Sequence, residues 1–565
     1  MLRKSTISSI LLIQLLTTIV TNAKYLINVD DSVNLNDCNF DDLRNISLLN
    51  SAPHEIVIHN CHLYGDLPNA LFIRFHKLRI LEITESHLKN IGDFAFNGLN
   101  DLRILNLGRN NITFVRTWTN ENLESLHTLD LRRNAITEVH KFAFTRYPKL
   151  LKLNLVANHI SSLPDELFRS IPLLKHLNLG KNNLKSIDSH TFKHLHKLIH
   201  LELKHNEIEF IEDESFVGLT HMKVLHLQDN KLTSFEQELI SNMPRLHHLN
   251  LSHNLLNEIK DETFEKNEEL ISLDLSYNKF EDFSTLSFKG LEVLEILNAS
   301  NNMIQNIDNA IFIDLTNLEY LDLSNNQISH IRSDKIFSTT QMLKTIKLND
   351  NLLQSIDDAV FSELKLQHLD LSCNNLSSDN FLWSETVEIA YLNLTYNAYT
   401  SINSSILENI IVTDFYENPF ICDWLAEEIF TSKNVHYGLD YVVKSRHDLF
   451  DTTGIECHDR NTHIVRRLIV LESTRVTGNG NDDDIETSED DELSRKHQST
   501  ATASIKFNYR LALVWFLVGT VAGFLSFTIF RCIMNRSKFK KKSEVNLKMN
   551  CENNFSSTLD ESRIM

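Results

Sequence analysis

The stretch LRILNLGRNNI, residues 102–112, returns 24 residues later as LHTLDLRRNAI, residues 126–136. Both copies fit the frame LxxLxLxxNxL, whose asparagine recurs every 24 residues and then at spacings of 25, 23 and 23. A repeat of this length cannot bury its own leucines, so neighbouring copies must stack and share one continuous core. The frame therefore predicts a solenoid. Its asparagines are Asn110, Asn134, Asn158, Asn182, Asn206, Asn230, Asn254, Asn278, Asn302, Asn326, Asn351, Asn374 and Asn397.

The leucines of the frame predict one short strand in each repeat. In LxL the apolar residues alternate with period two, so the leucines should face inward and the other residues outward. Fourteen frames run from Ser86, which replaces the first asparagine, to Asn397. At ~4.8 Å per strand they would form a parallel sheet roughly 65 Å long. The asparagine amide both donates and accepts, so it can bond backbone groups of its own turn and of the next one.

A phenylalanine follows most of these asparagines by about ten residues. Side chains at a constant place in stacked coils lie on one another, so we expect an aromatic spine beneath the convex side. We interpret it as core packing. The phenylalanines are Phe96, Phe144, Phe168, Phe192, Phe216, Phe264, Phe288, Phe312, Phe337 and Phe361.

Apolar segments flank the repeats at both ends of the chain. Residues 1–23 combine Arg3 and Lys4 with an apolar run, which is typical of a secretory signal peptide. Residues 511–530 carry no charge, are long enough to span a bilayer, and are followed at once by basic residues. We expect a single-pass type I protein of the plasma membrane with extracellular repeats. The expected segments are a signal peptide (1–23), an N-terminal cap region with a degenerate repeat (24–77), the repeats (78–410), a C-terminal cap (411–472), an acidic disordered stalk (473–509), a transmembrane helix (510–531) and a cytoplasmic tail (532–565).

The cysteines fit an extracellular domain. Cys38 and Cys61 occupy the asparagine slots of two degenerate frames, and equivalent slots on adjacent coils lie about 5 Å apart, within the Cα range of a disulfide. We expect this pair to close the N-terminal cap. Cys422 opens a helix-prone segment, and Cys457 is its only later extracellular partner. Cys373 is then left over, which suggests either an intermolecular bridge or a shielded free thiol.

The 24-residue frame with its phenylalanines resembles the typical class of extracellular leucine-rich repeats. The resemblance covers roughly residues 55–460 and implies an α/β solenoid with a curved parallel sheet on its concave face and terminal caps. The segment NPFICDW, residues 418–424, resembles the family's C-terminal cap, which usually reads NPxxCDC and holds two disulfides. Trp424 stands where the second cysteine would be, so we expect one bridge. Similar repeats occur in Toll-type ectodomains, although the tail expected here is too short for their cytoplasmic signalling domain, and in adhesion proteins of the Tartan/Capricious group.

N-x-S/T sequons narrow the surface that a partner could use. Three of them start between the two leucines of LxL, so they should point out from the C-terminal half of the concave sheet, where glycans would crowd a partner. The N-terminal half has no sequon in that position. All candidate glycosylation sites on the expected lumenal side are Asn45, Asn111, Asn250, Asn298, Asn375, Asn393 and Asn403.

Basic residues gather on that open half, although the chain has a net charge of −20. Asp130 and Glu202 are the acids expected between them. Opposite charge steers association and sets specificity, so our hypothesis is that an acidic partner, a protein or a glycosaminoglycan, binds here. The alternative is an ordinary solvated face, and a nucleic acid is not expected. The candidate ligand-binding residues, here named the basic face, are Arg109, Arg132, Arg133, Lys152, His176, Lys181, His200, Lys204, His205 and His226.

The histidines of the basic face allow a second hypothesis. Their protonation near about pH 5–6 would add positive charge, as in endosomal switches. A zinc site is not expected, because no spacing in the sequence converges three ligands on one point. No cofactor is expected either.

Two features near the membrane segment concern association and modification. Gly519 and Gly523 form a GxxxG pair, which would let two helices approach closely and is, with Cys373, a candidate route to a homodimer. Cys532 lies at the expected inner membrane face beside basic residues, so it is a candidate for palmitoylation.

The sequence favours a binding protein over an enzyme. It holds no nucleotide loop, no HExxH and no GxSxG, and the repeats leave no room for a catalytic module. Two hypotheses follow: a cell-adhesion or cell–cell recognition molecule, or a ligand-binding co-receptor of the innate immune or growth-factor type. The expected tail has no tyrosine, which fits either hypothesis, and no common docking motif, which favours adhesion.

Overall fold

The computed structural model describes residues 25–27, 32–46, 53–119, 123–307, 310–332, 336–357, 360–377, 388–402, 410–414, 418–421, 454–458 and 465–469. The chain forms two compact units, one of residues 1–450 with 455–467 and the other of residues 451–454 with 468–565. The repeats belong to the first unit. The expected signal peptide, stalk, membrane segment and tail lie outside the described residues. None of the helices within the described ranges has the length and hydropathy that crossing a bilayer requires.

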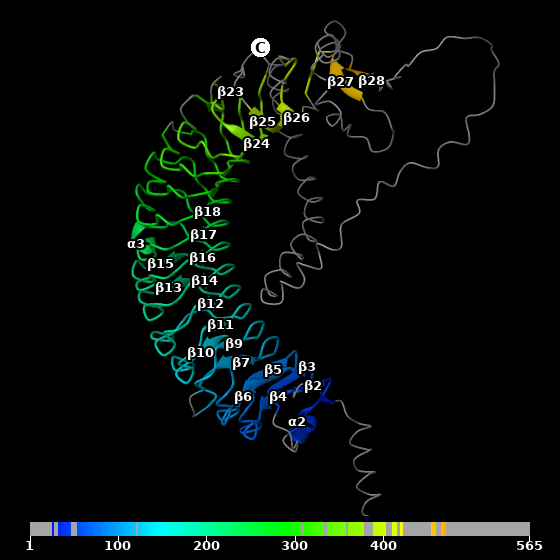
Figure 1. Ribbon diagram of the computed structural model, residues 1–565, viewed down its shortest axis with the longest axis vertical. Coiled ribbons are helices and arrows are strands. Elements are labelled where there is room, and N and C mark those ends of the chain that lie inside the picture. The colour runs from blue at the N-terminus through cyan, green and yellow to red at the C-terminus, as the bar shows by residue number, and fades with distance from the viewer. Residues whose placement is uncertain are drawn as a thin grey trace, which may run out of the picture. The chain divides into compact units, whose positions relative to one another are not determined.

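The repeat unit is built on one eighteen-stranded sheet that lines the inner side of a curve (Figure 1). The strands stack in chain order and parallel, with leucine opposite leucine, as in Leu153↔Leu177. Only the first strand runs antiparallel to its neighbour. The predicted curved solenoid with a concave parallel sheet is therefore confirmed. Its strands are β1 (Tyr25–Ile27), β2 (Ser32–Asn36), β3 (Glu55–His59), β5 (Ile80–Thr84), β7 (Ile104–Asn106), β9 (Thr128–Asp130), β11 (Lys152–Asn154), β12 (His176–Asn178), β14 (His200–Glu202), β16 (Val224–His226), β17 (His248–Asn250), β18 (Ser272–Asp274), β19 (Ile296–Asn298), β20 (Tyr320–Asp322), β22 (Thr345–Lys347), β24 (Lys365–Asp370), β25 (Glu388–Asn393) and β26 (Ile410–Asp414).

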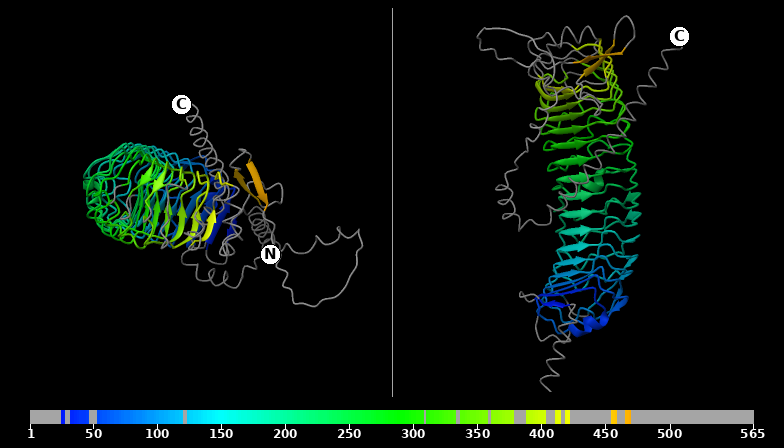
Figure 2. Two further views of the ribbon diagram at one scale, coloured as in Figure 1. Left: turned by 90° about the horizontal axis from the view of Figure 1, so that it is seen from above. Right: turned by 90° about the vertical axis from the view of Figure 1, so that its right-hand side faces the viewer.

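The opposite side of each coil has little regular structure, as the view from above in Figure 2 shows. Short strands pair there between neighbouring coils, and the two described helices have seven and four residues. Two further strands, which follow the repeats in the sequence, pair with each other. These elements are β4 (Gly65–Leu67) with β6 (Leu88–Ile91), β8 (Phe114–Val115) with β10 (Glu138–Val139), β13 (Ser186–Ile187) with β15 (Phe210–Ile211), β21 (His330–Ile331) with β23 (Ser355–Ile356), β27 (Gly454–His458) with β28 (Val465–Ile469), and the helices α2 (Phe40–Ile46) and α3 (Gln237–Ile240).

The asparagines form a buried ladder along the end of the sheet. The Nδ2 of Asn158 donates to the carbonyl of Leu155 in its own turn, at 2.9 Å, and to that of Leu131 in the preceding coil, at 3.1 Å. Its Oδ1 accepts the backbone N–H of Ile136, also in the preceding coil, at 3.1 Å. The predicted bonding is thus confirmed within the turn, but the second coil is the preceding one and not the next.

The phenylalanine spine is confirmed as buried packing. Phe192 is fully buried, with its ring centroid 5.8 Å from that of Phe168 and 6.1 Å from that of Phe216, and both pairs are stacked. The spine has two interruptions. Trp118 meets Phe96 edge-on in one of them, and α3 fills the other with buried aliphatic side chains.

Replacing Phe192 with alanine should destabilise the repeats by about 3–5 kcal/mol, because a buried ring is lost and the stacked neighbours hold the cavity open. Urea unfolding followed by circular dichroism measures this loss. Phe142, which is 51% exposed, provides the matched control. Its replacement by alanine should cost less than about 1 kcal/mol. Equal losses in the two variants would show that the rings do not hold the coils together.

The N-terminal end of the sheet carries the predicted disulfide. Cys38 and Cys61 are fully buried and bonded, with their Cα atoms 4.4 Å apart. They take the asparagine slots, since the N–H of Cys61 donates to the Oγ of Ser86 at 3.1 Å, in continuation of the ladder. At the other end, the ladder extends beyond the repeats expected at residues 78–410, because Nδ2 of Asn418 donates to the carbonyl of Leu394 at 2.9 Å.

Candidate functional site: the concave sheet

The residues of the basic face all lie on the concave sheet or in the turn that ends each strand. Those in strands face out of the sheet between inward leucines, as Lys152 does beside buried Leu153. The strand residues are Lys152 on β11, His176 on β12, His200 on β14 and His226 on β16, and the turn residues are Arg109, Arg132, Arg133, Lys181, Lys204 and His205.

The slot directly before each ladder asparagine has a left-handed backbone, which the repeat pattern alone did not reveal. Arg109, Arg133, Lys181 and His205 have φ values of 58°, 52°, 55° and 54°. Residues other than glycine rarely adopt this backbone region. A backbone hydrogen bond to the next coil stabilises this conformation. The N–H of Arg109, for example, donates to the carbonyl of Arg132 at 2.8 Å. The slot thus sets a regular column of side chains beside the strands.

Acidic neighbours neutralise part of the basic face. Arg109 pairs with Glu85, and this hydrogen bond lowers the pKa of the Glu85 carboxyl. The Nε of Arg132 lies 3.4 Å from Asp130, and Nδ1 of His205 lies 3.2 Å from Asp229. Only two of the acids at this end of the sheet, Asp130 and Glu202, were expected from the sequence. Acids that contact side chains of the concave strands and turns in these coils are Glu82, Glu85, Asp130, Glu202 and Asp229.

Three cations of the basic face remain available for a partner. Arg133, Lys152 and Lys181 are exposed and lie on three consecutive coils, whose strands β9, β11 and β12 are hydrogen-bonded neighbours. In the part of the chain that the structure describes, none of the three forms an ion pair. A run of unneutralised positive charge at this place can attract an anionic group.

The histidines differ from one another. Lys152 lies opposite His176, and the ring centroids of His176 and His200 are 6.1 Å apart. Burial lowers the pKa of His176, and the charges of Lys152 and His200 lower it further. His176 is therefore harder to protonate than an ordinary histidine.

The reason given against a zinc site is wrong. His200, Glu202 and His226 place one nitrogen or oxygen atom each within 4.8 Å of one another. Burial raises the pKa of Glu202, but hydrogen bonds from His200 and His226 and the nearby charge of Lys204 outweigh that effect, so its pKa is held well below the usual range. The spacing rule failed because it compared residues along the chain, whereas His226 comes from the next coil.

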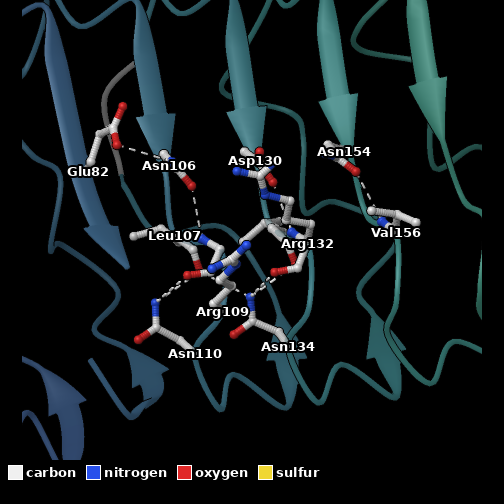
Figure 3. Close-up of polar contacts among 12 residues, drawn as sticks. Glu82, Asn106, Leu107, Arg109, Asn110, Asp130, Arg132, Asn134, Asn154 and Val156 are labelled. Atoms are coloured by element: carbon white, nitrogen blue, oxygen red, sulfur yellow. Dashed lines mark hydrogen bonds and ion pairs between the residues drawn. The ribbon is translucent and has the colours of Figure 1, made fainter. Parts of the chain in front are cut away.

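A turn stabilised by Asn or Asp recurs at the strand ends, as Figure 3 shows for three neighbouring strands. Oδ1 of Asn106 accepts the N–H of Gly108 at 3.0 Å, and Oδ1 of Asn154 accepts that of Val156 at 3.2 Å. This explains why the middle position of LxL is so often Asn or Asp. The signal was visible in the sequence as Asn or Asp four residues before most asparagines of the ladder, with Glu202, His226 and Lys347 as exceptions.

The same turn explains why three sequons have Asn at the middle position of LxL and Ser or Thr two residues later. Asn250 accepts hydrogen bonds from the N–H and the Oγ of Ser252, at 2.9 and 2.7 Å, and Asp274 accepts the same pair from Ser276. The sequences N-L-S and D-L-S therefore form the same hydrogen-bonded turn. Asn250, Asn298 and Asn393 are half-buried on β17, β19 and β25, as expected of concave positions, while Asn111 and Asn375 are exposed. The side chain of Asn45 and all of Asn403 lie outside the described part, and glycosylation of each site stays a prediction.

The C-terminal half of the concave sheet is aromatic and acidic. Lys347 Nζ lies 3.3 Å from Asp322 and 5.2 Å from the ring centroid of Tyr320. His368 stacks on Tyr391 with centroids 4.8 Å apart. The two halves of the sheet therefore differ in chemistry, and only the basic half was predicted from the sequence.

Replacing Asp350 with asparagine should stabilise the repeats at pH 7 by about 1–3 kcal/mol. Burial raises the pKa of Asp350 to about 6 from 3.8, so the folded state holds the proton more tightly than the unfolded state does. Its destabilising effect is absent well below pH 3.8, grows between pH 3.8 and about 6, and stays constant at higher pH. Asparagine fits the left-handed slot, which Asn301 and Asn325 occupy in other coils. Urea midpoints between pH 3.5 and 7.5 check this, and a gain that does not shrink toward acid pH would contradict it.

Cys373 is disulfide-bonded, so the expectation of a leftover cysteine is wrong. Its partner sulfur lies outside the described side chains. The same holds for the sulfurs of Cys422 and Cys457, whose bridge stays a prediction, and for Cys532, Gly519 and Gly523.

The fold and the concave surface define a solenoid whose inner sheet presents side chains to a partner. The leucine-rich repeat model matches seven overlapping segments between residues 76 and 339, and a second model of the same repeat matches residues 365–384. The chain belongs to the leucine-rich repeat family. No curated protein matched the sequence.

Three solved structures show the same fold. Toll in its complex with Spatzle, from Drosophila, has a TM-score of 0.55 at 23% identity, over 68% of this chain and 56% of that one. The LRIM1/APL1C complex gives 0.51 at 19% identity, over 89% and 80% of the two chains. A leucine-rich repeat protein of Leptospira interrogans gives 0.51 at 23% identity, over 66% and 87%. At these identities the similarity concerns the fold.

Proposed function

We propose that this chain is a cell-surface protein whose concave sheet binds an extracellular protein partner, in cell adhesion or cell–cell recognition. The observation that carries the proposal is the run of Arg133, Lys152 and Lys181, exposed and without ion pairs within the described ranges. The partner surface should accordingly be acidic. Toll with Spatzle and LRIM1 with APL1C are leucine-rich repeat proteins in complexes with protein partners, and this supports a binding role for the fold.

The location rests on the sequence. A secretory signal peptide at residues 1–23 and a transmembrane helix at residues 510–531 would place the repeats outside the cell in a type I topology. This topology, with Toll-type or Tartan/Capricious-like ectodomains as the architecture it resembles, is part of the proposal. Glycans on Asn250, Asn298 and Asn393 would leave the basic face as the open half of the sheet.

Cell mixing tests the proposed role. Non-adherent cells that carry the chain should form clusters, either with one another or with cells that carry the partner. Cells that stay dispersed while the chain copurifies with a signalling receptor would contradict adhesion and favour the co-receptor. A tagged, dimerised ectodomain, screened against cell-surface proteins with itself among them, supplies the partner for affinity measurements.

A further inference from the structure

Two neighbouring strands bring two imidazoles and a carboxylate to one place on the concave sheet. His200 and Glu202 are two residues apart on β14, so their side chains leave the same face. His226 on β16 lies directly opposite Glu202 in the parallel register. The three side chains therefore share one patch of surface without any rearrangement of the backbone.

The contacts within this patch are short. Nε2 of His200 lies 2.6 Å from Oε1 of Glu202, and Nδ1 of His226 lies 3.0 Å from the same oxygen. The side chains of His200 and His226 are 32% and 27% exposed, whereas that of Glu202 is 11% exposed. The carboxylate is thus held at the base of the patch, and the two imidazoles border it on the open side.

The second carboxylate oxygen is not satisfied by a well-aligned hydrogen bond. Lys204 Nζ lies 2.9 Å from Oε2 of Glu202 and forms an ion pair with it. Oε2 is nevertheless buried without an aligned donor among the residues that the structure describes. The charge of Lys204 therefore acts on Oε2 through its proximity rather than through a directional hydrogen bond. One oxygen faces Lys204, and Oε1 remains directed at the histidines.

We propose that His200, Glu202 and His226 form a binding site for a divalent transition metal ion of the Zn²⁺ type. Two imidazole nitrogens and one carboxylate oxygen are a common set of three protein ligands for zinc, with a fourth position left open. Ligand atoms at the usual zinc distances lie about 3.3 Å apart in a tetrahedron. The present atoms lie within 4.8 Å of one another, so small side-chain rotations suffice.

The competing interpretation is a purely hydrogen-bonded cluster of His200, Glu202, His226 and Lys204. Lys204 opposes a second cation by repulsion, but it pairs with Oε2 and leaves Oε1 to the metal. Binding of Zn²⁺ by this patch does not require the proposed adhesion partner. Failure of one proposal therefore leaves the other untouched.

Calorimetric titration of Zn²⁺ into the purified, chelator-treated full-length chain tests the site. We expect the wild-type chain to bind one Zn²⁺ ion with high affinity. The variants Glu202→Gln and His226→Ala should bind it at least about tenfold more weakly. Titration with Co²⁺ should give the visible absorption of a four-coordinate ion in the wild-type chain but not in these two variants. No high-affinity binding by the wild type, or binding by the two variants as tight as that of the wild type, would overturn the proposal and leave the hydrogen-bonded cluster.

Two controls separate loss of ligands from loss of fold. His205 lies in the same coil as His200 and Glu202, but its side chain pairs with Asp229 outside the patch. The variant His205→Ala should therefore bind Zn²⁺ with unchanged affinity. A tenfold loss in this variant would overturn the assignment, because scattered surface histidines would then hold the ion. Saturating Zn²⁺ should raise the Tm of wild type and His205→Ala but not that of Glu202→Gln, which keeps the volume of the side chain. A Tm rise in Glu202→Gln equal to that of wild type would overturn the proposal.

Discussion

Replacing Asn158 with leucine should lower the free energy of unfolding by about 3–6 kcal/mol. Asn158 is 4% exposed, and its side chain satisfies the carbonyls of Leu131 and Leu155 and the N–H of Ile136. Leucine has a similar volume but no polar atom, so three backbone groups would be left without partners in the core. Each such group costs about 1–3 kcal/mol, and partial entry of water reduces the sum.

Urea unfolding monitored by circular dichroism measures the loss. The matched control is Asn183→Leu, since Asn183 is an exposed asparagine that follows the ladder position of the next coil. This control should change stability by less than about 0.5 kcal/mol. Losses of equal size would mean that the ladder is not what fixes one coil to the next.

Reversing the charges of Arg133, Lys152 and Lys181 to glutamate should weaken binding of the partner by about 100-fold or more. Each cation stands exposed on the concave side and forms no ion pair within the described ranges. Losing about 1 kcal/mol of attraction per site, with repulsion added, gives a total near 3 kcal/mol. Stability should change little, because surface charges contribute little to folding.

The control for this variant reverses three exposed lysines that lie off the concave strands, Lys149, Lys185 and Lys197. It changes the net charge by the same amount, so a general charge effect would weaken binding equally in both proteins. Surface plasmon resonance at two salt concentrations gives the affinities. Wild-type binding should weaken as salt rises, and the triple variant should lose that dependence.

The fold follows from the sequence because each repeat is a local pattern copied many times. The leucines and the ladder asparagines together determine the strand, the turn and the stacking of each coil. A coil with an irregular sequence can therefore still be predicted from the regular coils next to it. The pattern fails where the spacing of the asparagines changes. Asn418 extends the ladder at a spacing of 21 residues from Asn397, although the sequence predicted it to be part of a cap motif.

The surface is harder to predict because it depends on contacts between coils. The outward placement of Lys152 and His176 follows from period two alone. The ion pair of Arg109 with Glu85 joins residues 24 positions apart and becomes visible only when coils are aligned. The convergence of His226 with Glu202 has the same origin. Aligning all coils in one frame before judging single residues would have shown both.

A glycan placed on the basic face tests most directly whether this surface holds the partner. Val156→Thr creates an N-L-T sequon that starts at Asn154 on β11, with the same spelling as the native sequon at Asn393, so the coil should keep its fold. Lys185→Thr creates a control sequon at Asn183, in the register of the native sequon at Asn111 and off the concave strands. Mass spectrometry establishes that each site is occupied. We predict that the glycan at Asn154 abolishes binding while the one at Asn183 leaves it intact, and full binding with Asn154 occupied would contradict a partner site on this face.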